Sequence, residues 1–172
     1  MSERTLLVLR HSKSAYPEGT ADVDRPLSDR GRRDAAKAGR WLRDQGLTPD
    51  LVVCSTAERT RETWDLISDQ LGWVGDEPGM LRYDPRLYEA SVADLLTVIR
   101  ETPDEASIVA LVGHNPGFAE LAAALTGQHG LTFPTSALAV IGFAGGWAGA
   151  APAAGTLAGL WTPKGGSALP AD

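Results

Sequence analysis

The 172-residue sequence contains a single cysteine, Cys54, and only three histidines. One cysteine cannot close an intramolecular disulfide, which excludes a fold held together by such bonds. The histidines are scattered along the chain and, together with Cys54, show none of the spacings typical of a structural zinc site. The sequence therefore implies no structural zinc, and we assign it no cofactor.

The sequence also lacks a long apolar run and a cluster of basic residues. The apolar stretch near the N-terminus, residues 5–9, is too short for the core of a signal peptide or for a membrane-spanning helix. The net charge of −6 argues against nucleic acid or an anionic membrane as a partner. These features favour a cytoplasmic protein, and the length suits one domain over residues 1–172.

Apolar segments rich in leucine, valine and isoleucine recur along the chain without polar alternation. Such runs are typical of strands that are buried on both faces of a sheet. They occupy residues 5–10, 51–54, 107–113 and 138–143. A further strand over residues 156–161 is expected at a sheet edge after a hairpin-like turn, and the chain beyond Pro163 is expected to be frayed.

Helical patterns alternate with these strands. They cover residues 28–45 and 56–71, and two more helices begin after Ser91 and after Asn115-Pro116. Ser28 can cap the first helix, and Ser91 with Asp94 resembles a capping box. The long connections are residues 17–26 and 72–85. The alternation predicts an α/β fold, a three-layer sandwich with a mainly parallel central sheet and helices on both faces.

Two arginines and two histidines follow different strands of this sheet. Arg10 and His11 come at the end of the first strand, Arg59 lies in the first turn of the helix after the second, and His114 directly follows the third. Each alone is more commonly a solvated or structural side chain. Because ligands bind outside the carboxyl ends of parallel strands, together they indicate a site. His129, in a loop, is given no role.

This set of side chains suits phosphoryl transfer. Arginine captures phosphate oxygens through two parallel hydrogen bonds, and its charge does not titrate. One histidine can accept a phosphoryl group on a ring nitrogen, which divides a difficult transfer into two easier steps. A second histidine, when protonated, offsets charge on the phosphoryl oxygens in the transition state. The sequence therefore predicts a phosphoryl pocket.

The same residues resemble the histidine phosphatase superfamily, which has the phosphoglycerate mutase-like fold. In that family the first strand ends in Arg-His-Gly, a later strand ends in Gly-His, and a second arginine lies in the pattern Ser-x-x-x-Arg-x-x-x-Thr. The matching residues here are Arg10-His11-Ser12, Gly113-His114, and Ser55, Arg59 and Thr63. The resemblance implies that His11 is the nucleophile, that Arg10, Arg59 and His114 bind the phosphoryl group, and that no metal is needed.

Finer features resemble the SixA-type phosphohistidine phosphatases, a bacterial branch of the superfamily. They are the segments Arg-Pro-Leu-Ser (25–28) and Pro-Thr-Ser-Ala (134–137), with Gly31 after the first of them. This resemblance implies a metal-independent phosphatase that acts on phosphohistidine of a partner protein through a phosphohistidine intermediate. The alternatives are a phosphatase for small phosphorylated metabolites and a phosphate-binding module without turnover.

Two candidate residues keep two interpretations each. Ser12 replaces the motif glycine, so either its backbone adopts a permitted conformation or its N–H shifts slightly, and its hydroxyl offers a further phosphate contact. Glu89 stands where many members of the superfamily carry a catalytic carboxylate, which predicts a general acid. The alternative for Glu89 is a structural carboxylate favoured by the dipole of the helix that follows.

The short distance from Arg59 to Glu89 bears on the substrate. Only 29 residues separate them, which leaves no room for an insertion that would cover a small substrate. An uncapped pocket admits a protein side chain, so a phosphorylated partner protein is favoured over a mutase reaction, which must retain its intermediate.

A cysteine phosphatase is the rival enzyme, because Cys54 also ends a strand. Such a site needs five residues between cysteine and arginine, whereas Arg59 follows after four and Arg61 after six. Cys54 is therefore interpreted as a small buried residue. Trp147 and Trp161 are interpreted as core residues rather than interface residues, and the oligomeric state is left open.

Overall fold

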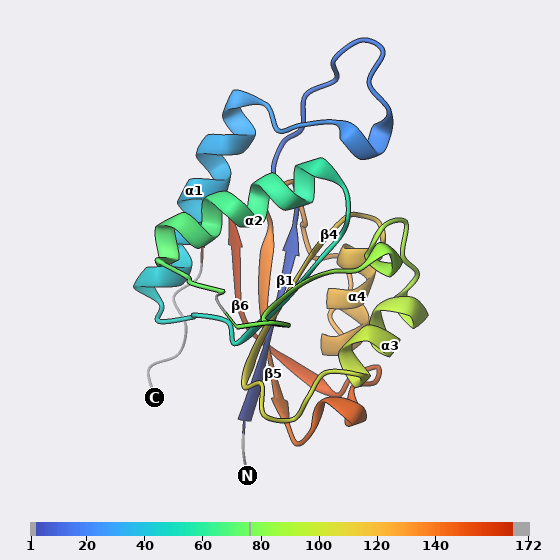
Figure 1. Cartoon of the computed structure of the whole chain (residues 1–172). Coiled ribbons are helices and arrows are strands. Elements are labelled where there is room, and N and C mark those ends of the chain that lie inside the picture. The colour runs from blue at the N-terminus through green and yellow to red at the C-terminus, as the bar shows by residue number, and fades with distance from the viewer. Residues whose placement is uncertain (1–2, 76, 167–172) are drawn as a thin grey trace.

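The structure, a computed structural model, describes residues 3–75 and 77–166 and is built on one mixed sheet (Figure 1). Its strands are β1 (Glu3–Arg10), β2 (Leu51–Cys54), β3 (Leu81–Tyr83), β4 (Ile108–Gly113), β5 (Leu138–Ala144), β6 (Gly155–Thr162) and β7 (Gly165–Gly166). The strand order is β3-β2-β4-β1-β5-β6-β7. The part from β3 to β1 is parallel, and β5, β6 and β7 add antiparallel strands beyond it.

Four helices cover the two faces of this sheet. They are α1 (Asp29–Asp44), α2 (Glu58–Leu71), α3 (Val92–Arg100) and α4 (Gly117–Thr126), and the 3₁₀ turns are η1 (Asp22–Asp24), η2 (Pro85–Leu87) and η3 (Trp147–Gly149). Figure 1 shows α1 and α2 on one face and α3 and α4 on the other. The α/β class with three layers is thus confirmed. Within the described residues, no helix combines the length and apolar character needed to cross a membrane.

The central strand β1 supplies both hydrophobic cores. Leu7 and Leu9 pack in the core beneath α1 and α2, whereas Leu6 and Val8 pack in the core beneath α3 and α4. Successive side chains of a strand point to opposite faces, so an uninterrupted apolar run is required at this position. The parallel pairing of β1 with β4 places Arg10 opposite Gly113, at the end of both strands.

The predicted ends of the helices match local chemistry. The Ser28 hydroxyl oxygen accepts a hydrogen bond from the Gly31 N–H at 3.1 Å, and Ser91 and Asp94 form the reciprocal capping box. Gly72 ends α2 with a left-handed backbone, φ 61°. Helix α2 begins at Glu58, two residues later than expected, and Pro116 immediately precedes α4.

Strand β3 was not predicted, because it lies within the connection assigned to residues 72–85. It has three residues, pairs with β2 in parallel, and exposes two of them, so the sequence carries no strand periodicity there. The expectation of fraying beyond Pro163 was wrong for residues 165–166, which form β7 against β6. Residues 167–172 of that tail lie outside the described residues. The interpretation of Trp147 and Trp161 as core residues is confirmed, since both are buried.

Candidate active site

The carboxyl ends of β2, β4 and β1, which are neighbours in the sheet, meet at one edge. Arg10 ends β1 opposite Gly113, which ends β4, so His11 and His114 leave adjacent strands at the same level. Their ring centroids are 5.2 Å apart. Arg59 reaches the same edge from the first turn of α2, after β2. The structure therefore brings His11, His114 and Arg59 together at one edge of the sheet, as the order of the segments predicts.

The His11 ring is fixed in one tautomer by its own neighbour. Its Nδ1 lies 2.7 Å from the Ser12 carbonyl oxygen. A carbonyl oxygen only accepts, so Nδ1 carries the proton and Nε2 keeps its lone pair. Burial lowers the pKa of His11 to about 4, and the nearby charges of Arg59 and Arg10 act in the same direction. The imidazole is therefore neutral near pH 7, as a nucleophile requires.

The His114 ring is oriented by Ser55, which directly follows β2. Its Nε2 lies 2.8 Å from the Ser55 hydroxyl, and its buried Nδ1 has no hydrogen-bond partner among the described residues. Burial, followed by the nearby His11 and Arg59, lowers the pKa of His114 to about 3, so its ring is neutral near pH 7. A buried polar atom without a partner is costly, and a phosphoryl oxygen would provide one.

The Arg59 guanidinium is buried and held by Asp22 of η1. One terminal nitrogen donates to the Asp22 backbone carbonyl at 2.7 Å, and the other donates to the Asp22 carboxylate at 3.1 Å. The same carboxylate accepts hydrogen bonds from Arg25, at 2.9 Å, and from the Tyr88 hydroxyl. Asp22 and Tyr88 are thus parts of the site that the sequence interpretation did not identify. No local signal distinguishes Asp22 from the other acidic residues of its loop.

Arg10 is half-buried at the back of the site. One of its terminal nitrogens donates to the Phe133 carbonyl at 3.1 Å, and Asn115 donates to the same oxygen at 2.9 Å. The Arg10 Nε is buried without a partner among the described residues. The Phe133 carbonyl, in the loop before β5, therefore holds both Arg10 at the end of β1 and Asn115 after β4.

Ser12 is fully buried and turned toward other hydroxyl groups. Its N–H donates to Thr63 Oγ at 3.0 Å, and its own hydroxyl oxygen accepts from Ser136 at 2.6 Å. Its φ is not positive, so serine fits this backbone without the freedom of glycine. Its N–H is committed to Thr63, and the predicted contact of its hydroxyl with phosphate stays a prediction.

The three residues of the pattern around Arg59 connect the site. Ser55 holds His114, and Thr63 accepts from Ser12 while donating to the Arg59 carbonyl at 2.6 Å. The spacing of four places Arg59 and Thr63 on one face of α2, toward the strand ends. The pattern is therefore a structural frame around the two histidines.

A pocket of about 350 Å³ opens beside these groups. Its lining residues are Asp22, Arg59, Tyr88, Glu89, Ala90, His114, Asn115, Pro116 and Gly117. Glu89 has a left-handed backbone, φ 56°, which is uncommon for a residue with a side chain. It precedes the N-cap Ser91 by two residues, and Asp94 supplies the carboxylate of the first turn of α3. The role of Glu89 at the pocket stays a prediction.

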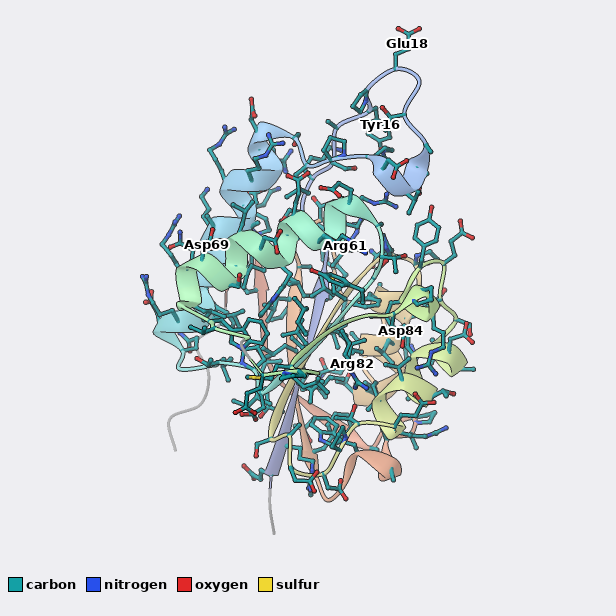
Figure 2. All side chains as sticks on the ribbon, viewed as in Figure 1. Tyr16, Glu18, Arg61, Asp69, Arg82 and Asp84 are labelled. Atoms are coloured by element: carbon teal, nitrogen blue, oxygen red, sulfur yellow. The ribbon has the colours of Figure 1, made fainter. Side chains whose placement is uncertain are left out.

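The geometry rejects the cysteine phosphatase alternative. Cys54 is completely buried, and burial raises the pKa of its thiol to about 12. A thiol that stays protonated is neither a nucleophile nor a phosphate ligand. Arg61 lies on α2 (Figure 2), and its guanidinium stacks 3.9 Å from the centroid of the Tyr83 ring. It does not line the pocket that contains Arg59.

Comparison with known proteins agrees with this geometry. Residues 6–107 match the family model of the histidine phosphatase superfamily (branch 1). The chain is 40% identical over 167 residues to the protein Rv1276c of Mycobacterium tuberculosis, and this match covers 91% of the chain and 100% of the relative.

Solved structures extend the likeness to nearly the whole fold. A protein of Nakamurella multipartitia, provisionally described as the phosphohistidine phosphatase SixA, is 32% identical, with a TM-score of 0.82 over 95% of this chain and 98% of its own. A protein of Agrobacterium tumefaciens with the same provisional description is 30% identical, with a TM-score of 0.73 over 81% of this chain and 92% of its own. A SixA structure with tungstate shares the fold at 23% identity and a TM-score of 0.79, over 93% and 97% of the two chains.

Proposed function

The chain belongs to the histidine phosphatase superfamily and is SixA-like, and we propose that it hydrolyses phosphohistidine of a partner protein through a phosphohistidine intermediate on His11. The observation that carries this proposal is the state of His11. A neutral imidazole whose Nδ1–H is held by the Ser12 carbonyl presents the lone pair of Nε2 beside His114 and near the arginines.

In the first step, the Nε2 lone pair of His11 forms a bond to phosphorus. The bond from phosphorus to the leaving nitrogen of the substrate breaks, and that nitrogen takes up a proton from solvent. Arg10 and Arg59 offset the negative charge on the equatorial oxygens during this transfer, and the neutral His114 ring donates a hydrogen bond from Nδ1 to one of them. The side chains are held before substrate binds, so little reorganisation is needed in the transition state.

In the second step, water attacks the phosphorus of phosphorylated His11. The bond between phosphorus and Nε2 breaks, the electron pair returns to the ring, and inorganic phosphate leaves. The superfamily resemblance supports this sequence of two displacements, and neither step requires a metal ion.

The short connection between α2 and α3 supports a protein substrate. In the described part of this connection, only β3 and η2 occur, and neither forms a domain over the pocket. Among the described residues, no such domain covers the pocket, and Asp22 of the loop that carries Tyr16 and Glu18 lines it. This loop projects past the end of the sheet (Figure 2). A histidine side chain on a folded partner can reach such a site.

The test is turnover with a histidine-phosphorylated carrier protein and with p-nitrophenyl phosphate. We expect phosphate release from the carrier by the wild-type protein, complete loss of release in His11→Ala, and no loss in His129→Ala, which removes an exposed histidine. Rapid acid-free quenching followed by mass spectrometry should locate the covalent phosphate on His11. Release that survives in His11→Ala, or an adduct on another residue, would refute the mechanism.

A second candidate function, hydrolysis of phosphate esters, is favoured by one observation. Glu89 lines the pocket and is a candidate to protonate an alkoxide leaving group, which leaves less readily than an imidazole. The same assay distinguishes the two functions by the ratio of kcat/KM for the carrier and for the ester.

A further inference from the structure

The wall of the pocket is more acidic than a phosphate site requires. Arg59 is the single cationic residue among the described residues that line the pocket, apart from the titratable His114, whereas two carboxylates, Asp22 and Glu89, line it as well. If both arginine and histidine are engaged by the phosphoryl group, the surface that meets the rest of the substrate carries negative charge.

Asp22 is fixed in place although its side chain is half-exposed. Its carboxylate receives hydrogen bonds from Arg59, Arg25 and Tyr88, which come from three different segments of the chain. The Tyr88 hydroxyl, followed by the two arginines, holds the pKa of Asp22 well below its usual range. Asp22 is thus ionised near neutral pH, and it is not a proton donor there.

Charge balance shows what the site can accommodate. Arg10, Arg25 and Arg59 bring three positive charges toward the strand ends, a phosphoryl dianion brings two negative charges, and Asp22 brings the third. The positive charges are then matched. A second anionic group on the substrate would meet Asp22 and Glu89 with no arginine left to pair with it.

We propose that Asp22 is a specificity-determining residue that excludes substrates carrying a second anionic group next to the phosphoryl group. Neutral and cationic carriers of the phosphoryl group are admitted, and the imidazole of phosphohistidine is one of them. This inference rests on the proposed phosphatase function. It narrows the substrate class, because phosphorylated metabolites with a neighbouring carboxylate or second phosphate are disfavoured.

The test compares two aryl phosphates that differ by one charge, para-carboxyphenyl phosphate and para-carbamoylphenyl phosphate. The measured quantity is the ratio of kcat/KM for the carbamoyl substrate to that for the carboxyl substrate. We expect Asp22→Asn to lower this ratio about tenfold, equivalent to ~1.4 kcal/mol, because the substitution removes one like charge from a partly solvated pocket. In the wild-type protein, added salt should lower the ratio as well.

Asp24→Asn is the matched control, because Asp24 lies in the same 3₁₀ turn, is exposed, and forms no ion pair within residues 3–75 and 77–166. Its ratio should equal that of the wild-type protein. A ratio that Asp22→Asn leaves unchanged while turnover persists would overturn the inference. So would an equal change in Asp24→Asn, since that would reflect the net charge of the protein.

A binding experiment covers the case in which Asp22→Asn loses turnover because Arg59 moves. Calorimetry with methylphosphonate and phosphonoacetate measures the same one-charge difference without catalysis. We expect Asp22→Asn to narrow the difference in affinity between the two ligands, and an unchanged difference overturns the inference. Absence of turnover by the wild-type protein on every substrate would instead refute the proposed function, whereas the binding comparison would still decide the role of Asp22.

Discussion

The Thr63 hydroxyl is predicted to couple the stability of the protein to the position of His11, the proposed nucleophile. Thr63→Val keeps the shape of the side chain but removes the acceptor of the buried Ser12 N–H and the donor to the Arg59 carbonyl. That carbonyl lies within α2 and keeps a helical partner, whereas the Ser12 N–H loses the partner it has here. An unpaired buried N–H costs about 1–3 kcal/mol.

We therefore expect Thr63→Val to lower the free energy of unfolding by ~2 kcal/mol, which for a chain of this size is a fall in Tm of about 4–8 °C. Activity should fall as well, because the Ser12 carbonyl fixes the His11 tautomer. If Ser12 shifts, part of the population presents the wrong nitrogen, and we expect kcat to fall about tenfold, equivalent to ~1.4 kcal/mol.

Thr97→Val is the control for this prediction. Its hydroxyl donates to the Ala93 carbonyl at 3.0 Å on an exposed face of α3, so the same chemical change leaves no buried group unpaired. Urea unfolding followed by circular dichroism, together with steady-state kinetics, measures both effects. If Thr63→Val were no less stable than Thr97→Val, or were less stable with kcat unchanged, the coupling between Thr63 and His11 would be wrong.

Three further predictions concern the titratable groups. Glu89→Gln should slow hydrolysis of a phosphate ester much more than of a phosphohistidine protein, and equal slowing of both would remove the general-acid role. Because the pKa values of His11 and His114 are depressed in the folded protein, the unfolded chain binds more protons than the folded one below pH 6.5. The free energy of unfolding should therefore fall as the pH drops from about 7 to 4. Urea unfolding at each pH should show a weaker fall for His114→Asn. Cys54→Ala should retain activity while losing ~1–2 kcal/mol of stability, and abolished turnover in a folded variant would restore the cysteine alternative.

The convergence of the charged side chains was predictable because it follows from topology. A run such as residues 51–54 reads as a doubly buried strand, and parallel strands end at a common edge. Arg10, His11 and His114 directly follow such runs, so their neighbourhood required only the order of the segments. The branch of the superfamily came from short patterns elsewhere in the chain, at residues 25–28 and 134–137.

Other parts were not predictable, because they depend on contacts between segments without periodicity. Asp22 and Tyr88 lie 66 positions apart in the chain and meet through a single hydrogen bond. Strand β3 exists because β2 presents an open edge, and two of its three side chains are exposed. The periodicity of apolar residues in a sequence indicates which face of an element is buried, but a polar contact between loops produces no such periodicity.

The site owes its rigidity to the distribution of its parts over several elements. Each histidine has one ring nitrogen held by a hydrogen bond. For His11 the partner is the carbonyl of the adjacent Ser12, and for His114 it is the hydroxyl of Ser55, at the end of the neighbouring strand β2. Ser12 is in turn held by Thr63 of α2, so displacement of α2 would move Arg59 and the frame around His11 together. A phosphoryl group transferred between nitrogen atoms needs an in-line approach, and side chains locked by packing and hydrogen bonds maintain that alignment. The loop that carries Asp22 is anchored to this frame through Arg59 itself, so the group that we propose to bind the phosphoryl oxygens also positions the carboxylate that we infer to select among substrates.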